Sequence, residues 1–354
     1  MQDMLLKVQQ RGSESEWRGR DPLSGAAPHQ ITLISQEPDR RPLRAREHLP
    51  CRPEFRRRYA ASRSFAPKSG DPEFARDGGQ IEADPKHVSS KMPLPSIKIY
   101  PDKFVGQVAL ITGAAQGIGQ VTARLFAAQG ATVVLVDIQE DKLQRVADEI
   151  AAQKNGKADV RVCDIGDENQ VNALVEGVIS EFGQIDITVH LAGVYPFIPI
   201  IGHSTEQYRR IMNVNMDGCF FLTRAVLPHM NKRGYGRIIN TSSGTLQLPD
   251  NGLSVYVAAK SAIVGFTRST AVEAGTGVTA NIILPGLIRT EAVWNNHVQP
   301  DGSHVLFDRL IQKQCIKRHG QPGDIAYTIC FIASPEAAFT TGQIFDVGGG
   351  ATFH

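Results

Sequence analysis

Residues 107–129, QVALITGAAQGIGQVTARLFAAQ, decide the fold of this 354-residue chain. The run VALIT predicts a strand, and the apolar residues that follow the glycines recur at helical spacing. Between them, Gly113, Gly117 and Gly119 form a GxxxGxG loop, not the GxGxxG of the commonest dinucleotide fingerprint. A helix that begins at Gly117 offers free N–H groups and a partial positive charge to a pyrophosphate. The loop therefore predicts a dinucleotide site, and a glycine turn without a ligand is the alternative.

An acidic residue stands where such a site would bind the adenosine ribose. The second apolar run, ATVVLVD, ends at Asp137, and a carboxylate at this spacing accepts hydrogen bonds from ribose hydroxyls. The same carboxylate repels a 2′-phosphate, and no Arg or Lys stands in the glycine loop or directly after Asp137. NAD is therefore favoured over NADP. Asp164 and Ile165 are candidate contacts to the adenine. For both aspartates a helix N-cap is the alternative role.

Strand-like and helix-like segments alternate along the rest of the chain. Strands are predicted at 107–112, 131–137, 158–164, 184–193, 236–242 and 277–284. Helices are predicted at 117–129, 139–153, 168–181, 205–230 and 254–273. This alternation predicts an α/β fold of the Rossmann-like, doubly wound kind, in which helices cover both faces of a parallel sheet.

The first 91 residues differ in composition from the remainder. They hold 17 basic and 13 acidic residues and 9 of the 20 prolines, whereas residues 92–354 hold 21 basic and 23 acidic ones. A Pro- and Arg-rich stretch without periodicity buries little apolar surface, so a disordered basic extension is predicted at 1–91. A basic arm for nucleic acid or lipid, or a true start at Met92, are the other interpretations. A single domain is expected at 92–354.

Composition also narrows the class of protein. With 42% hydrophobic and 21% charged residues and a net charge of +2, the chain has no general signature of a nucleic-acid or membrane partner. The five cysteines form no CxxC pair, so no metal is expected and the reduced thiols of a cytoplasmic protein are favoured. No apolar run reaches the ~20 residues that span a bilayer.

The candidate chemistry lies in the second half of the chain. Tyr256 and Lys260 are four residues apart, so a helix would place both side chains on one face. Ser243 stands at the end of a predicted strand, and Asn215 is a polar amide within an apolar predicted helix, where it needs a partner. A solvated Tyr–Lys pair without function is the alternative.

Together these motifs resemble the short-chain dehydrogenase/reductase family. The resemblance rests on TGAAQGIG (112–119), Asp137, NVNMDG (213–218), Ser243 with Tyr256-x-x-x-Lys260, and PGLIRT (285–290), and it covers about residues 104–350. It implies a seven-stranded parallel sheet in the order 3-2-1-4-5-6-7. It also implies a set of cofactor-binding residues: Thr112, Gly113, Gln116, Gly117, Ile118, Gly119, Asp137, Ile138, Asp164, Ile165, Ala192, Gly193, Tyr256, Lys260, Pro285, Gly286, Ile288 and Thr290.

The resemblance implies a catalytic role for four residues. Tyr256 would be the general acid/base on the substrate oxygen, and Ser243 would orient that oxygen. Lys260 would hold the nicotinamide ribose and lower the pKa of Tyr256, because an ammonium at ~4 Å is worth about 4 kcal/mol at an effective dielectric of ~20. Asn215 would hold a water that links Lys260 to solvent. His190 stands where the family usually has an amide, and a structural role is expected for it.

The segments expected to line the substrate pocket are apolar or aromatic. They are 194–199, Leu246, Val293, Trp294 and Phe307, and no Arg or Lys cluster for a phosphate or coenzyme A is apparent; residues 291–320 are expected to form a lid. An NAD-dependent oxidoreductase of a hydrophobic secondary alcohol or ketone, aromatic or cyclic, is therefore expected. A 3-ketoacyl-type reductase of the same family and a non-catalytic NAD-binding scaffold are the alternatives. The resemblance also implies a homo-oligomer, either a tetramer or a dimer.

Overall fold

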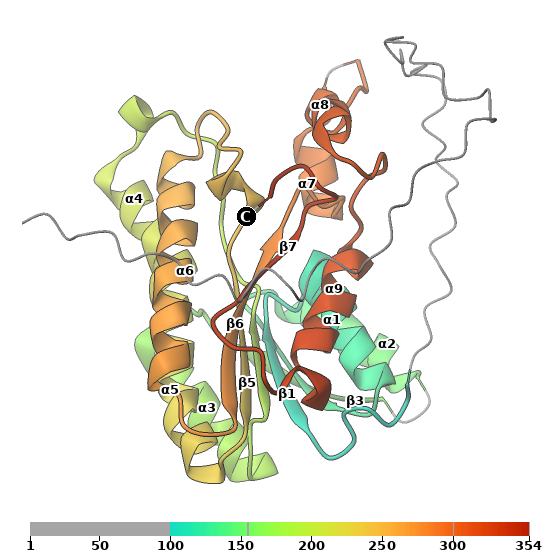
Figure 1. Ribbon diagram of the computed structural model, residues 1–354, viewed down its shortest axis with the longest axis vertical. Helices are drawn as coiled ribbons and strands as arrows, with labels where there is room; N and C mark the ends of the chain where they lie inside the picture. The colour runs from blue at the N-terminus through green and yellow to red at the C-terminus, as the bar shows by residue number, and fades with distance from the viewer. Residues whose placement is uncertain (1–99, 154–155, 300, 354) are drawn as a thin grey trace, which may run out of the picture. The chain divides into compact units, whose positions relative to one another are not determined.

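Seven parallel strands form one sheet in the order β3-β2-β1-β4-β5-β6-β7 (Figure 1). The computed structural model describes residues 100–153, 156–299 and 301–353, and the extension predicted at 1–91 lies outside the described residues. The strands are β1 (Val108–Thr112), β2 (Thr132–Asp137), β3 (Lys157–Val162), β4 (Ile187–His190), β5 (Gly236–Thr241), β6 (Val278–Pro285) and β7 (Ile344–Val347). The predicted Rossmann-like architecture is therefore confirmed, including the strand order that the resemblance implied.

Strand β1 shows why these segments form a buried parallel sheet. Ala109 and Ile111 pack with Phe126 in the core on one face, whereas Val108 and Leu110 pack in the core on the other. Successive side chains of a strand point to opposite faces, so a strand covered on both sides needs apolar residues at every position. The continuous run VALIT meets that need.

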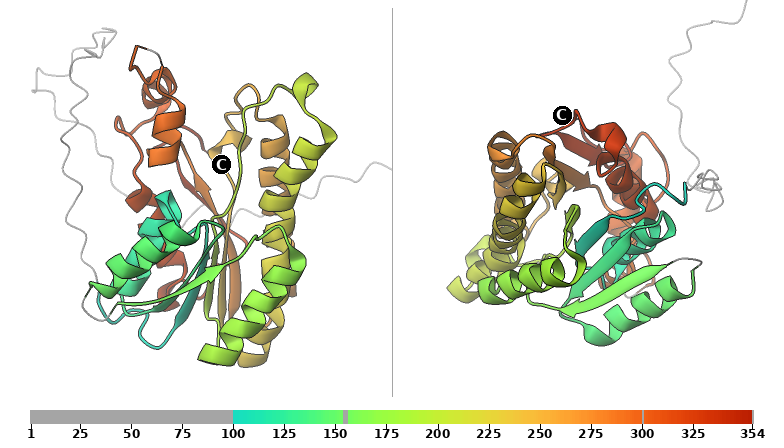
Figure 2. Two further views of the ribbon diagram at one scale, coloured as in Figure 1. Left: turned by 180° about the vertical axis from the view of Figure 1, so that it is seen from behind. Right: turned by 90° about the horizontal axis from the view of Figure 1, so that it is seen from below.

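The long helices cover the two faces of the sheet (Figures 1 and 2). On one face lie α1 (Gly117–Ala128), α2 (Glu140–Ala151) and α9 (Pro322–Ile332). On the other lie α3 (Glu168–Phe182), α5 (Gly218–Arg233) and α6 (Ser254–Glu273). Shorter helices are α4 (Thr205–Met212), α7 (Glu291–Asn296) and α8 (Val305–Lys313), with 3-10 turns at Ile200–Gly202, Gly244–Leu246 and Pro335–Ala337.

The single helix predicted at 205–230 is wrong. The structure has α4, then a π-helical turn at Asn213–Asp217, then α5. The Asn215 amide Nδ2 donates to the carbonyl oxygens of Ile211 (2.9 Å) and Val194 (2.8 Å), the second of which belongs to the loop after β4. The turn thus aims Asn215 at the sheet, and such π-helical insertions are frequent at functional sites.

Helices in the described part of the chain do not combine the length and hydropathy that crossing a bilayer requires. The same residues contain no group of three or more His, Cys, Asp or Glu side chains placed to hold a metal ion.

Candidate active site

A cavity of about 670 Å³ lies at the carboxyl ends of the strands, where the order reverses between β1 and β4. Ligands of open α/β sheets bind at this position, and the volume is in the range of cofactor and substrate sites. The cavity brings together every candidate catalytic and cofactor-binding residue that the sequence indicated: Thr112, Gly113, Gln116, Gly117, Ile118, Gly119, Asp137, Ile138, Asp164, Ile165, Ala192, Gly193, Asn215, Ser243, Tyr256, Lys260, Pro285, Gly286, Ile288 and Thr290.

The glycine loop is shaped by close backbone packing. Gly113 has φ +68°, and a Cβ there would lie 2.8 Å from the backbone nitrogen of Ala192. A Cβ on Gly119 would lie 2.1 Å from the carbonyl oxygen of Gly113, so only glycine lets α1 begin directly over the loop. Gln116, at the N-cap position of α1, makes no side-chain capping bond, and no acidic residue occupies the first turn. The first N–H groups of α1 therefore remain available, which fits an anionic pyrophosphate.

Asp137 lies at the end of β2, beside the glycine loop. Its Oδ2 accepts a hydrogen bond from the Ala115 N–H (3.3 Å), and its Oδ1 accepts one from the Gln139 N–H (3.1 Å). Helix α2 begins at Glu140 with Gln139 as its N-cap, so the alternative in which Asp137 is an N-cap is wrong. Lys142 was missed by the sequence analysis: its Nζ donates to the Gln116 Oε1 (3.0 Å), which places a cation at the rim of the loop.

Asp164 is likewise not a helix cap. The N-cap of α3 is Asp167, whose side chain accepts from the Asn169 and Gln170 N–H groups. Asp164 instead turns the chain, because its Oδ1 accepts from the Gly166 N–H (2.9 Å). Its carboxylate and Ile165 line the same end of the cavity as Asp137.

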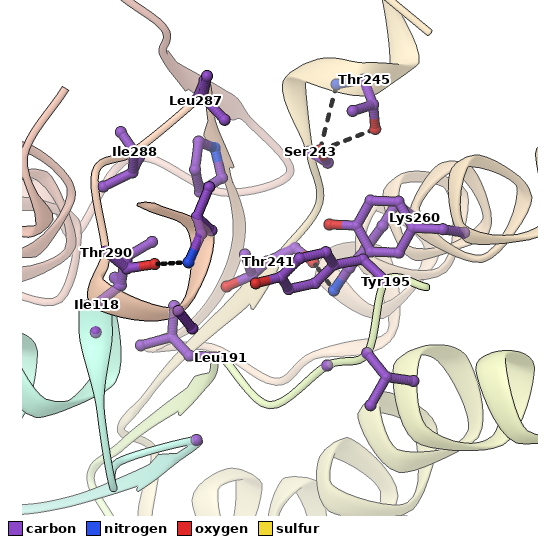
Figure 3. A pocket seen from close by; sticks show the side chains of 18 of the residues that line it. Ile118, Leu191, Tyr195, Thr241, Ser243, Thr245, Lys260, Leu287, Ile288 and Thr290 are labelled. Atoms are coloured by element: carbon purple, nitrogen blue, oxygen red, sulfur yellow. Dashed lines mark hydrogen bonds between the residues drawn. The ribbon is translucent and has the colours of Figure 1, made fainter. Parts of the chain in front are cut away.

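The segment after β5 and the first turns of α6 position the three candidate catalytic side chains, of which Ser243 and Lys260 are labelled in Figure 3. Ser243 follows β5, and its Oγ accepts from the backbone N–H (3.2 Å) and the hydroxyl (2.9 Å) of Thr245. Lys260 is 3% exposed; its Nζ donates to the Thr241 carbonyl (3.0 Å) and lies 5.8 Å from the centre of the Tyr256 ring. The helical spacing has therefore placed both α6 side chains at the same wall of the cavity as Ser243.

The pKa values of this pair differ from the sequence expectation. Burial raises the pKa of Tyr256 to about 12, and a hydrogen bond with Ser243 only partly opposes the rise. Burial also lowers the pKa of Lys260 to about 8. The expected lowering of the Tyr256 pKa by Lys260 does not appear, because desolvation of the phenolate is the largest effect on this group.

Asn215 and His190 lie deep beneath this wall. Asn215 is fully buried, and its Oδ1 has no partner in the part of the chain that the structure describes. A Cβ on Gly193 would come within 2.6 Å of that Oδ1 and 3.5 Å of the Lys260 Nζ, so the free oxygen and the ammonium face the same point. Nδ1 of His190 lies 3.2 Å from the Thr112 hydroxyl oxygen, and burial, with the Lys260 charge, lowers the pKa of His190 to about 3.

The substrate end of the cavity only partly matches the expected lining. Val194, Tyr195, Phe197 and Val293 line it as predicted. Trp294 and Phe307 do not: their rings pack against each other 4.9 Å apart, and Phe307 is 1% exposed. Leu246 also lies outside the lining, where Leu248 takes its place. Both helices of the expected lid, α7 and α8, contribute residues to the cavity.

Basic residues at this end were missed by the sequence analysis. Arg210 of α4 and Arg309 and Lys313 of α8 all line the cavity, although no Arg or Lys cluster was expected. Arg309 pairs with Asp250 at 2.7 Å. The i,i+4 spacing of Arg309 and Lys313 on a short helix was the available signal, but nothing in the sequence indicated which face of that helix meets the cavity.

Comparison with known proteins finds many chains of similar sequence and structure. Residues 113–352 match the family model described as "Enoyl-(Acyl carrier protein) reductase". The chain is 38% identical over 245 residues to the (2S)-[(R)-hydroxy(phenyl)methyl]succinyl-CoA dehydrogenase subunit BbsD of Thauera aromatica, a match that covers 69% of this chain and 96% of that protein. It is 35% identical over 249 residues to the 3-oxoacyl-[acyl-carrier-protein] reductase FabG of Thermotoga maritima, covering 70% and 98%.

Two further matches have other substrates in their names. The meso-2,3-butanediol dehydrogenase of Serratia marcescens is 33% identical over 253 residues, covering 71% of this chain and 96% of that protein. The crystal structure of a short-chain dehydrogenase/reductase, glucose/ribitol dehydrogenase, from Brucella melitensis superposes with a TM-score of 0.65 at 28% identity, covering 71% and 99%.

Proposed function

The chain belongs to the short-chain dehydrogenase/reductase family, whose oxidoreductases use a nicotinamide cofactor, and we propose that it transfers a hydride between NAD(H) and a hydrophobic secondary alcohol or its ketone. One observation carries this proposal. Ser243, Tyr256 and Lys260 meet at the wall of a single cavity that also contains the glycine loop and Asp137. A non-catalytic scaffold would have no use for all three side chains in that arrangement.

The residues present fit a dinucleotide. The uncapped start of α1 and the glycines around it would hold the pyrophosphate. Asp137 would bind the adenosine ribose, and Asp164 with Ile165 would contact the adenine. The nicotinamide end would lie against residues from the ends of β4 and β6: Ala192, Gly193, Pro285, Gly286, Ile288 and Thr290. When bound, the oxidised nicotinamide supplies the hydride acceptor and a positive charge.

Tyr256 is the proposed general base for alcohol oxidation and the general acid for ketone reduction. Its pKa of about 12 must fall by several units for the phenolate to form near neutral pH. The Lys260 Nζ lies 5.8 Å from the centre of the Tyr256 ring, and a positive charge on that side of the phenol would favour the phenolate. The Ser243 hydrogen bond and the positive charge of the oxidised cofactor would favour it further.

Ser243 and Asn215 have supporting roles in this proposal. The Ser243 Oγ already accepts two bonds from Thr245, so its one proton is left to donate. The hydrogen bond with Tyr256 uses this proton, and a substrate oxygen bound between the two side chains would compete for it. The free Oδ1 of Asn215 faces the same point as the Lys260 ammonium. A water bound there would carry protons between Lys260 and solvent.

Aromatic or cyclic substrates suit the cavity wall best. Val194, Tyr195, Phe197 and Leu248 form an apolar surface beside Ser243, and the Thauera relative is named for a hydroxy(phenyl)methyl compound. A panel of secondary alcohols with NAD and with NADP, followed at 340 nm, tests the assignment. Aryl alcohols with NAD should give the highest kcat/KM.

The Tyr256→Phe variant is the matched control for this panel. It should retain NAD binding, measured by fluorescence titration, and lose at least about a hundredfold in kcat, because general acid–base catalysis contributes about 10²–10⁴-fold. Unchanged turnover by the variant would contradict the assignment of Tyr256.

A 3-ketoacyl-type reductase is the second candidate, and a specific observation favours it. Arg210, Arg309 and Lys313 at the substrate end provide positive charge for an anionic carrier, and the Thermotoga relative is named for such a reaction. Reduction of acetoacetyl-CoA with NADH or NADPH at a higher kcat/KM than any aryl ketone would favour this candidate.

The proposal extends to organisation and location. Residues 92–354 would form the single catalytic domain of a cytoplasmic homo-oligomer, a tetramer or dimer that associates through α5 and α6. Phe220 on α5 is 37% exposed, and the Arg224 guanidinium covers its ring at 4.9 Å. Analytical ultracentrifugation of the full chain measures the assembly directly.

A further inference from the structure

The cavity contains a second phenol that the proposed chemistry does not use. Figure 3 shows Tyr195, from the loop after β4, extending into the space that Ser243 and Lys260 also face. Its ring centre lies 6.1 Å from that of Tyr256, with the two planes at 64°. Within the described residues its hydroxyl has no hydrogen-bond partner, although the side chain is half-buried. We infer that Tyr195 selects substrates that carry a second oxygen beside the reacting carbon, as in α-hydroxy ketones and vicinal diols.

The backbone on both sides of Tyr195 is fixed. The carbonyl of Val194 accepts from the Asn215 amide at 2.8 Å, and the Ile198 N–H donates to the Gly252 carbonyl at 2.8 Å. Gly252 has φ +80°, and a Cβ there would come within 3.1 Å of the Ile198 nitrogen, so this contact is tight. The hydroxyl is thus presented to the cavity from an anchored segment and does not need a large rearrangement to meet a ligand.

The nearness of the two phenols suggests where the second oxygen would be. Tyr256 and Ser243 would hold the reacting oxygen, so Tyr195 is left to bond another atom of the same molecule. Their ring centres are 6.1 Å apart, close enough for both phenols to contact one small substrate, and the inference places the second oxygen on the carbon beside the reacting one. This inference rests on the proposed function, since it assumes that Ser243 and Tyr256 bind the reacting oxygen.

Discrimination between substrates should be strong because a bound substrate displaces water. Without substrate, water can bond the Tyr195 hydroxyl, but an apolar substrate displaces that water and leaves the hydroxyl without a partner. A substrate with an oxygen at the right carbon restores the bond. Sites that offer a hydrogen bond to a substrate oxygen discriminate strongly against the analogue that lacks it.

Two matched ketones and one conservative variant test the inference. The probes are 2-hydroxyacetophenone and propiophenone, which differ by a hydroxyl in place of a methyl group. Their kcat/KM values with NADH are measured for the full-length wild-type protein and for Tyr195→Phe. The ketones differ in intrinsic reactivity, so the decisive quantity is the change in their kcat/KM ratio between the two proteins. Tyr208→Phe, on the exposed side of α4 and outside the cavity, is the control.

We expect Tyr195→Phe to lose at least tenfold on 2-hydroxyacetophenone and less than twofold on propiophenone, while Tyr208→Phe keeps the wild-type ratio. A ratio that Tyr195→Phe leaves unchanged would overturn the inference, and so would equal losses on both ketones. In either case turnover of propiophenone would leave the proposed function standing. Absence of wild-type turnover of both ketones would instead contradict the proposed function, and the inference with it.

Discussion

Tyr256 and Lys260 lie one turn apart on α6, and burial moves their pKa values in opposite directions. The pKa of the phenol rises to about 12 and that of the ammonium falls to about 8, so burial disfavours the charged form of each side chain. The site therefore favours a neutral phenol until a further positive charge arrives. A bound oxidised nicotinamide would supply such a charge, so the proposed base would become active when the cofactor is present.

Asp137 is the single side chain proposed to set the preference for NAD over NADP. The Ala115 and Gln139 N–H groups bond different oxygens of Asp137. Asp137→Asn therefore keeps an acceptor for only one of them, and it removes the charge that repels a 2′-phosphate. With Lys142 close by at the rim, we expect the NAD-to-NADP ratio of kcat/KM to fall at least tenfold. Steady-state kinetics with both cofactors measures it. Asp141→Asn, in the first turn of α2, is the control, and an unchanged ratio in Asp137→Asn would exclude this role.

Two contacts join the helices of the expected lid to the opposite wall of the cavity. Arg309 of α8 pairs with Asp250 of the loop before α6, at 2.7 Å. The ring of His297, after α7, lies 5.0 Å from that of Phe197, in the loop after β4. Both contacts cross the substrate end of the cavity. Because the Arg309 side chain is 55% exposed, the ion pair contributes little to stability, and its main effect is on the position of α8.

Substituting Arg309→Met should therefore act on substrate binding and not on folding. We expect KM for an aryl alcohol to rise about threefold while the free energy of unfolding changes by less than about 0.5 kcal/mol. Arg124→Met removes a partly exposed ion pair between α1 and Glu149 of α2, at two residues that do not line the cavity, and should leave KM unchanged. Equal KM values in both variants would show that the Arg309 pair does not position the lid.

Sequence patterns predicted the elements with strong periodicity and missed those defined by tertiary contacts. The strand run VALIT and its glycine loop were predictable because local sterics impose them. The break between α4 and α5 was not, since the Asn215 amide finds its partner, Val194, in a loop that is distant in the sequence. The face of α8 that meets the cavity could not be predicted for the same reason. Only the tertiary structure shows that Arg309 and Lys313 line the cavity.

One buried histidine in the sheet should make the stability of the whole domain depend on pH. His190 is 1% exposed at the end of β4, and its Nδ1 faces the Thr112 hydroxyl of β1 at 3.2 Å. The hydroxyl oxygen also accepts from the Leu191 and Ala192 N–H groups, so its proton is directed to Nδ1. Burial keeps the imidazole neutral and lowers its pKa to about 3. Protonation would place a charge in the centre of the fold.

The sign of the resulting pH dependence follows from this lowered pKa. Between about pH 6.5 and pH 3 the unfolded chain binds a proton at His190 that the folded chain does not, so stability falls as the pH falls. The loss should reach about 3 kcal/mol at pH 4. In urea titrations, His190→Asn should lose less stability between pH 7 and pH 4 than the wild type. His229→Asn, on exposed α5 surface, should behave as the wild type, and a wild-type slope in His190→Asn would contradict the prediction.

Transfer of deuterium from a labelled alcohol tests the central claim most directly. The wild-type protein is incubated with NAD and 1-phenylethanol deuterated at the carbinol carbon, and the reduced cofactor is analysed by mass spectrometry. The proposed Ser243–Tyr256–Lys260 centre predicts one deuterium per reduced NAD, with no label above background for Tyr256→Phe. Reduced NAD without deuterium, or equal labelling by the Tyr256→Phe variant, would contradict it.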